Sequence, residues 1–177
     1  LSFSLNRSKT NPPDELDLLV NMFNNMRQKL NADVDIIKKT SKALQENEQR
    51  LSIALQGSNS GIWDWNIKTG KVFFDTNYFS MAGYEPDEFP YKFEEWEKRV
   101  HPDDLAKSKK EISNYLDGTT KEFGVEFRFK TKQHDWIWIL SQGKIFEYDK
   151  DGSPIRFTGT HRNITKLKLA QFDKIKA

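Results

Sequence analysis

The sequence predicts an α+β fold: a five-stranded antiparallel sheet with helices on one face, preceded by a long coiled-coil helix. Three patterns lead to this class. Apolar residues first follow a heptad repeat, then two short alternating segments appear, and three long alternating segments follow a run of helical ones. The 177 residues are only 36% hydrophobic yet 13% aromatic. Since 20 of the 23 aromatic residues lie between residues 61 and 165, the front of the chain is a separate polar element.

The first predicted element is one helix over residues 14–56, a stretch without interior proline or glycine. Pro12 and Pro13 mark its start, and Asp14 is its predicted N-cap. Steps of three and four along this helix define an apolar seam, made of Leu16, Leu19, Phe23, Met26, Leu30, Ile37, Leu44 and Leu51. Because a narrow seam needs a partner, we expect a homodimer through this helix. Docking along the rest of the chain is the alternative.

Polar residues interrupt the second row of the seam at Asp33, Thr40 and Asn47. Polar residues at such positions reduce the stability of a coiled coil. We therefore expect a dimer that is firm near Phe23 and looser further on, which suits a helix that rotates or changes register. The alternative is that the helices splay there.

The rest of the chain alternates between strand and helix patterns. Gly57 and Gly61 delimit the break that ends the long helix. Strands are predicted at residues 62–67, 71–75, 122–131, 136–148 and 154–164, and helices at 77–82, 86–89, 93–99 and 102–116, with an exit helix from Thr165. Turns are expected at residues 68–70, 132–135 and 149–152.

The motifs of this second part resemble those of a PAS domain. Its first half is similar in Gly61-Ile62-Trp63-Asp64-Trp65-Asn66, Met81-Ala82-Gly83-Tyr84 and His101-Pro102-Asp103-Asp104, and its PAC half in Glu126-Phe127-Arg128, Trp136 to Ile139 and Gly159 to Thr165. Two positions depart from the family pattern. His134-Asp135 replaces the usual Asp-Gly of a hairpin, and Asn163 replaces the usual Asp before Ile-Thr. An amide there forms a hydrogen bond without charge assistance.

Residues 11–30 resemble the second helix of a HAMP domain, through the Asp14-Glu15 start and the Phe23-Asn24-x-Met26 core. The implied order is a HAMP connector remnant at 1–13, the HAMP second helix continuing as a coiled coil at 14–47, a PAS/PAC sensor at 48–165 and an exit helix at 166–177. Since the chain begins with Leu1 rather than Met, we expect a fragment of a longer protein. The resemblance implies that this fragment is the cytoplasmic part of an inner-membrane protein.

Charge and cysteine content exclude several functions. The 28 basic and 26 acidic residues give a net charge of +2, too small a field to recruit nucleic acid. Membrane contact is expected only through segments upstream of the chain, because the longest apolar run, residues 136–140, is far too short to span a bilayer. Zero cysteine excludes thiolate metal sites and the PAS chromophores that attach through sulfur.

Trp65, Phe79, Phe127 and Trp138 are the candidate residues for a cleft between sheet and helices, unless side chains alone fill that space. No cofactor is the first expectation, and a non-covalent flavin or another small ligand stays open. Haem is not expected, because PAS relatives bind it through a histidine on the long helix and residues 102–116 contain none. No metal site is predicted: the acidic pair after His101 favours a helix start.

Signatures of catalysis are missing from the sequence, which has no phosphate-binding glycine loop and no histidine on the coiled helix. The resemblance implies a cytoplasmic module for signal sensing and relay in a membrane-bound sensor histidine kinase of a two-component system. The alternatives are the input module of a diguanylate cyclase and a dimerisation spacer without a ligand. For the relay to an output domain of the same chain we select Asn163, as a latch to the sheet, and Thr165, as N-cap of the exit helix.

Overall fold

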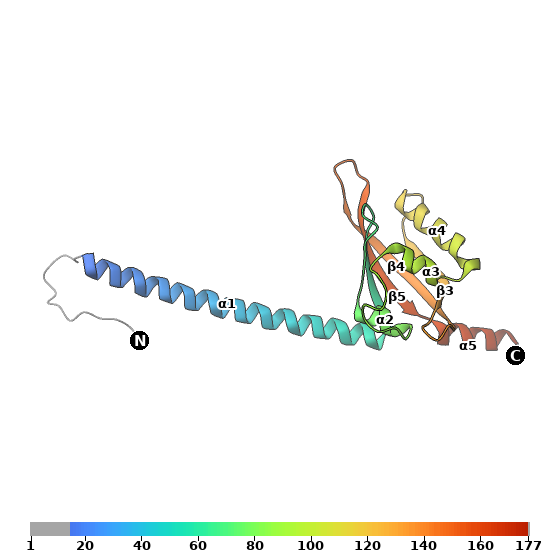
Figure 1. The fold of residues 1–177 in the computed structure, drawn as a ribbon, viewed down its shortest axis with the longest axis horizontal. Coiled ribbons are helices and arrows are strands. Elements are labelled where there is room, and N and C mark those ends of the chain that lie inside the picture. Colours follow the sequence, from blue (N-terminus) through green and yellow to red (C-terminus); the bar gives the residue numbers. More distant parts are fainter. Residues whose placement is uncertain (1–14, 177) are drawn as a thin grey trace. The chain divides into compact units, whose positions relative to one another are not determined.

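The computed structural model describes residues 15–176. Along the chain, one compact unit ends at Leu51 and a second begins at Ser52. It confirms the predicted α+β class, a five-stranded antiparallel sheet preceded by a long helix (Figure 1). The elements are α1 (Glu15–Gly57), β1 (Ser60–Asn66), β2 (Val72–Phe74), α2 (Thr76–Met81), α3 (Phe93–Arg99), α4 (Pro102–Leu116), β3 (Phe123–Lys130), β4 (Trp136–Tyr148), β5 (Pro154–Asn163) and α5 (Thr165–Lys176).

Helix α1 is continuous, as the absence of interior proline and glycine predicts. Over the described residues 15–57 it buries no side chain. The seam residues are about half exposed, from 47% at Leu16 to 66% at Ile37. An exposed apolar row leaves the free energy of its burial available to a partner. The predicted N-cap Asp14 and the expected HAMP connector at residues 1–13 lie outside the described residues.

The sheet has the strand order β2-β1-β5-β4-β3, and each neighbouring pair is antiparallel. Pairing of β1 with β5 joins the two early strands to the three late ones, with Trp63 opposite Gly159. The strand that leads into the exit helix is therefore the central strand of the sheet. A movement of β5 therefore changes its pairing with both β1 and β4.

One face of the sheet carries the core. On β3 the side chains of Phe123, Val125, Phe127 and Phe129 are buried on the core side, as the alternation predicts. Helices α3 and α4 lie on the same side of the sheet (Figure 1). They add Trp96 and Leu105 to the core cluster. The opposite face of β3 presents Glu126 and Arg128.

The centre of the sheet is bare on the core side because two glycines face each other there. Gly143 of β4 pairs with Gly159 of β5. A Cβ added to Gly159 would lie 2.6 Å from a ring carbon of Trp63 and 2.0 Å from the carbonyl oxygen of Gln142. The indole of Trp63 therefore packs directly on the backbone of two strands, and no larger residue fits beneath it.

The short helix predicted at residues 86–89 is wrong, because this segment forms a turn. Asp87 has a φ of 63°, in the left-handed region that ends a right-handed helix. The Glu88 carboxylate accepts a hydrogen bond from the backbone N–H of Glu85 at 2.8 Å and closes the turn. The turn places Phe89 in the core, where it is 5% exposed.

We predict that Gly159→Ala lowers the free energy of unfolding by at least about 2 kcal/mol, because the added methyl group overlaps backbone and indole. Gly124→Ala is the matched control. It lies on an exposed position of β3, where the nearest atom is 4.0 Å from the added carbon, and it should change stability by less than about 1 kcal/mol. Urea denaturation measures both. Equal stability of the two variants would contradict the packing described for Trp63.

Candidate functional site

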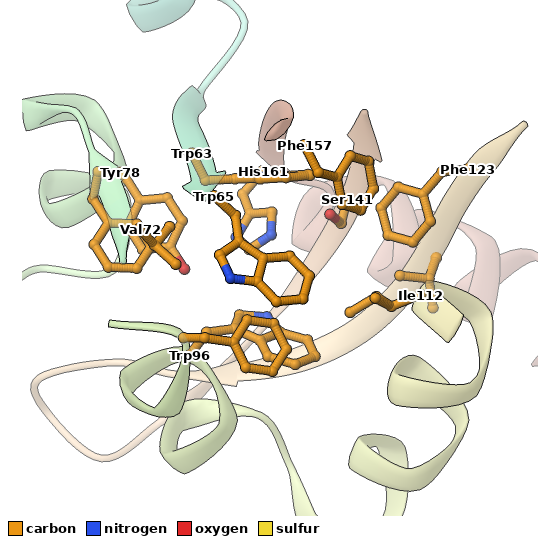
Figure 2. Close-up of a pocket in the computed structure, with 13 residues that line it drawn as sticks. Trp63, Trp65, Val72, Tyr78, Trp96, Ile112, Phe123, Ser141, Phe157 and His161 are labelled. Atoms are coloured by element: carbon orange, nitrogen blue, oxygen red, sulfur yellow. The ribbon is translucent and has the colours of Figure 1, made fainter. Parts of the chain in front are cut away.

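The candidate site is a cavity between the sheet and the helices α3 and α4. Figure 2 shows the indole of Trp65 across the middle of this cavity, with Trp96 and Ile112 from the helices and His161 from the sheet around it. The lining consists of Trp63, Trp65, Val72, Phe74, Tyr78, Phe93, Trp96, Ile112, Phe123, Val125, Ser141, Phe157 and His161. The cavity volume is about 40 Å³, enough for roughly three water molecules. Aromatic side chains thus fill most of the predicted cleft.

Of the four residues selected from the sequence for this cleft, the cavity lining includes Trp65. Phe79 and Phe127 are buried in the core, at 1% and 0% exposure, outside that lining. Trp138 lies on the opposite face of the sheet, between the core-facing positions 137 and 139 of β4. The structure therefore brings only Trp65 of the four to the cavity.

Sequence reasoning missed His161 and Tyr78 as lining residues. His161 lies four positions after Phe157 on β5, so the two-residue period of a strand places both on one face. That signal was available in the sequence. Tyr78 comes from α2, whose position against the sheet has no comparable signal. Their rings approach to 5.0 Å between centroids.

Trp65 and Phe93 close the cavity on one side. Their rings are stacked, with centroids 4.4 Å apart and 16° between the planes. The same two residues and Ile112 also line a groove on the outside of the domain, together with Lys109 and Leu116. The stack therefore lies between the cavity and the outer groove.

The cavity carries no net charge at neutral pH. None of its described lining residues is Asp, Glu, Lys or Arg. Burial raises the pKa of Tyr78, partly opposed by the charge of Arg99, and burial lowers the pKa of His161 to about 3. Both side chains are neutral as a result. A charged ligand would lose its hydration here without gaining an opposite charge.

Five polar atoms around the cavity have no hydrogen-bond partner within the described chain. They are the indole nitrogens of Trp63, Trp65 and Trp96, the hydroxyl of Tyr78 and Nδ1 of His161. Buried polar groups are almost always paired in folded proteins. Five unpaired polar atoms around one small cavity favour an uncharged molecule or ordered water as their hydrogen-bond partner.

The cavity does not fit a flavin in this conformation, because a tricyclic ring system is several times larger than the few waters that the volume accommodates. Within the described residues, His, Asp and Glu form no group of three that could hold a metal ion. A ligand therefore has to be small, or the stack of Trp65 and Phe93 has to open for it.

The junction between β5 and α5 uses the two residues selected for signal relay, with their expected contacts exchanged. The side-chain carbonyl of Asn163 accepts from the backbone N–H of Thr165 at 3.0 Å, so Asn163 caps the helix start. The hydroxyl of Thr165 accepts from the backbone N–H of Trp138 at 2.9 Å, so Thr165 is the latch to the sheet. The exchange follows from α5 beginning at Thr165 itself.

Asp103 and Asp104 lie in the first turn of α4, as expected for a helix start. Pro102 occupies the first turn, and Nδ1 of His101 accepts from the backbone N–H of Asp103 at 3.2 Å. Asp104 also binds the guanidinium of Arg128, with Nε 2.8 Å from Oδ2. This hydrogen bond lowers the pKa of the Asp104 carboxyl.

Fold and cavity together define a class of protein: an α+β sensor domain with a small aromatic cavity under its helices and a junction from the central strand to an exit helix. A family described as the PAS fold matches residues 71–161. The chain belongs to this family. It is of the kind found in histidine kinases and diguanylate cyclases.

Three relatives show where such domains occur. A sensory box histidine kinase/response regulator from Burkholderia thailandensis is 31% identical, with a TM-score of 0.61, over 72% of this chain and 92% of that structure. The probable diguanylate cyclase DgcE of Escherichia coli is 26% identical over 136 residues, 77% of this chain. The N-terminal domain of a diguanylate cyclase with PAS/PAC sensor from Marinobacter aquaeolei shares the fold, with 15% identity and a TM-score of 0.55 over 62% of this chain and 98% of that one.

This chain spans only 12% of the length of the Escherichia coli relative. The match therefore does not show the activity of the whole protein to which this chain belongs. Among residues 15–176, none of the helices has an apolar stretch long enough to cross a bilayer.

Acid should unfold the domain through His161. Its pKa is about 3 in the fold and near 6.5 in an unfolded chain, so between these values the unfolded state binds one more proton. The contribution of neutral His161 is complete above about pH 6.5 and is lost as the pH falls toward 3, with a slope of about 1.4 kcal/mol per pH unit. Urea denaturation between pH 7 and pH 4 measures it.

In His161→Phe the one-proton part of this slope should disappear. His134→Asn is the control, because His134 is exposed and Asn tolerates its φ of 69°. The assignment fails if His161→Phe and the native chain lose stability with the same slope between pH 6 and pH 4.

Proposed function

We propose that the chain is the signal-sensing and relay module of a membrane-bound sensor histidine kinase in a two-component system. The observation that carries this proposal is the 31% identity to a sensory box histidine kinase over 92% of that structure. The small uncharged cavity and its connection to the exit helix support it, since a sensor needs both an input site and an output element. The proposed output domain follows α5 in the same chain.

The proposed relay runs along β5. Ser141 and His161 line the cavity from the neighbouring strands β4 and β5, opposite each other in the register. Two residues beyond His161, the side chain of Asn163 caps α5. A molecule that enters the cavity and displaces His161 would shift the end of β5 and with it the start of α5. The energy available is its difference in affinity for the two positions.

The long helix supplies the proposed link to the membrane and to a second copy. Under this proposal residues 14–47 are the second HAMP helix and its coiled-coil continuation, and the seam pairs in a homodimer. The half-exposed seam supports it. The module would then lie on the cytoplasmic side of an inner membrane, anchored through segments upstream of residue 1.

A diguanylate cyclase is the second candidate for the whole protein. The relative from Escherichia coli, which matches 77% of this chain, favours it. A phosphoacceptor histidine helix in the sequence beyond Ala177 would support the kinase, and a Gly-Gly-acidic cyclase loop would support the cyclase. A spacer without a ligand is the third candidate, and a small molecule retained in a native mass spectrum would count against it.

The relay is tested by Asn163→Ala and Thr165→Ala in the complete protein. Each variant loses one hydrogen bond at the start of α5, worth about 0.5–1.5 kcal/mol, so the ratio of active to inactive states should change about two- to tenfold. Autophosphorylation of the kinase measures this ratio, and circular dichroism reports folding. Arg162→Ala, an exposed neighbour on β5, is the control. Unchanged output from folded Asn163 and Thr165 variants would refute the relay.

The homodimer is tested by disulfide cross-linking. Because the chain has no cysteine of its own, only the introduced cysteines can form a disulfide. We expect Leu30→Cys to cross-link two copies readily and Ile37→Cys to cross-link less, because the polar layers follow Asp33. Lys29→Cys, off the seam, is the control. Non-reducing gel electrophoresis measures the dimer fraction. Failure of both seam variants to exceed the control would exclude the proposed pairing.

A further inference from the structure

On the face of the sheet opposite the cavity, two cations approach the indole of Trp138. The guanidinium carbon of Arg128 is 5.7 Å from the centroid of the indole, and Nζ of Lys168 is 5.3 Å from it. Both are within the range in which a cation is attracted to an aromatic face. Arg128 belongs to β3 and Lys168 to α5, so the indole joins a strand at the edge of the sheet to the exit helix.

Each cation is also held by a carboxylate. Nζ of Lys168 lies 2.5 Å from Oε2 of Glu126. The guanidinium of Arg128 binds both oxygens of Asp104 at 2.8 Å, and the backbone N–H of Arg128 donates to the same carboxylate at 2.9 Å. Two-point pairing between a guanidinium and a carboxylate is directional as well as strong. It orients Arg128 against the indole.

Lys168 is the main side-chain contact of α5 with the rest of the domain. Among residues 166–175 it alone is partly buried, with 20% of its side chain exposed. Leu167, Leu169 and Phe172 are exposed at 54%, 57% and 46%. Apart from the hydrogen bonds at its start, α5 is therefore held by the charge of Lys168 and not by apolar burial. Such contacts are weak singly and are screened by salt, which makes this helix easy to release.

We propose that Asp104, Arg128, Trp138, Lys168 and Glu126 form a clamp that couples helix α4 to the exit helix α5. Helix α4 lines the cavity through Ile112 and binds Arg128 through Asp104 near its N-terminus. A displacement of α4 by a molecule in the cavity therefore acts on Arg128, then on the indole of Trp138, and then on Lys168. This route is separate from β5 and Asn163.

The biological purpose of the clamp depends on the proposed sensor role, but the contacts that form the clamp do not. The coupling itself is a property of the chain alone, without ligand, membrane or output domain. It is therefore measured in the 177-residue chain by hydrogen–deuterium exchange of the α5 amides, with amides of β4 and β5 as an internal reference for global opening.

Lys168→Gln should accelerate exchange in α5 about fivefold, because it removes the ion pair and the contact with the indole. Asp104→Asn should accelerate it about threefold although Asp104 belongs to another helix, because Arg128 loses its two-point anchor. Lys166→Gln, an exposed lysine of the same helix, should change nothing. In the native chain, raising the salt concentration should have the same effect as Lys168→Gln.

The double variant of Asp104 and Lys168 decides between a clamp and independent contacts. A clamp predicts that Asp104→Asn has little further effect once Lys168 is replaced. Unchanged α5 exchange in a folded Asp104→Asn variant, or effects that simply multiply, would overturn the coupling. If Asp104→Asn also accelerates the reference amides, Arg128→Lys takes its place, since it keeps the charge and loses the two-point geometry. If the clamp variants alter α5 exchange as expected but leave the signalling output of the complete protein unchanged, the clamp stands and the result counts against the sensor role.

Discussion

The packing of the Trp63 indole on the bare backbone of Gly143 and Gly159 is the constraint on which the rest of this domain depends. It holds the paired strands β1, β5 and β4 in one register, because any side chain at either glycine would overlap the ring or a carbonyl oxygen. The same indole meets Phe157 edge-on at 4.8 Å and lines the cavity. One ring therefore sets both the centre of the sheet and one wall of the candidate site.

The two faces of the sheet differ in chemistry because they differ in what covers them. The helix-covered face is aromatic and uncharged, and burial keeps His161 neutral there. The opposite face remains partly exposed and carries charges, such as Arg128 and Lys168 against Trp138. The first face holds a small uncharged cavity, whereas Lys168 of α5 forms an ion pair with Glu126 on the second. The cavity and the contact with α5 thus depend on different kinds of interaction: apolar burial on one face and charge on the other.

How far the site could be predicted depends on which residue is considered. Both Asn163 and Thr165 were selected from a motif, and both make contacts at the start of α5, but which of them caps and which binds the sheet depends on where the helix begins. Trp138 lies outside the cleft for which the sequence analysis selects it. Both rows of β4 contain large apolar residues, so alternation alone does not say which row faces inward. The turn at Asp87 has no periodic signal, since its shape comes from a single positive φ.

Local patterns in the sequence determined the long helix, the positions of the strands and turns, and the membership of the aromatic part in a PAS-like fold. These follow from heptads, two-residue alternation and glycine turns, each readable within a few residues. The tertiary structure decided the strand order, the face on which Trp138 lies and the cavity volume. Those depend on contacts such as the hydrogen bond from Thr158 to Trp63, whose partners are 95 residues apart in the chain. A local pattern carries no information about which distant strand completes it, or about how much space their side chains leave.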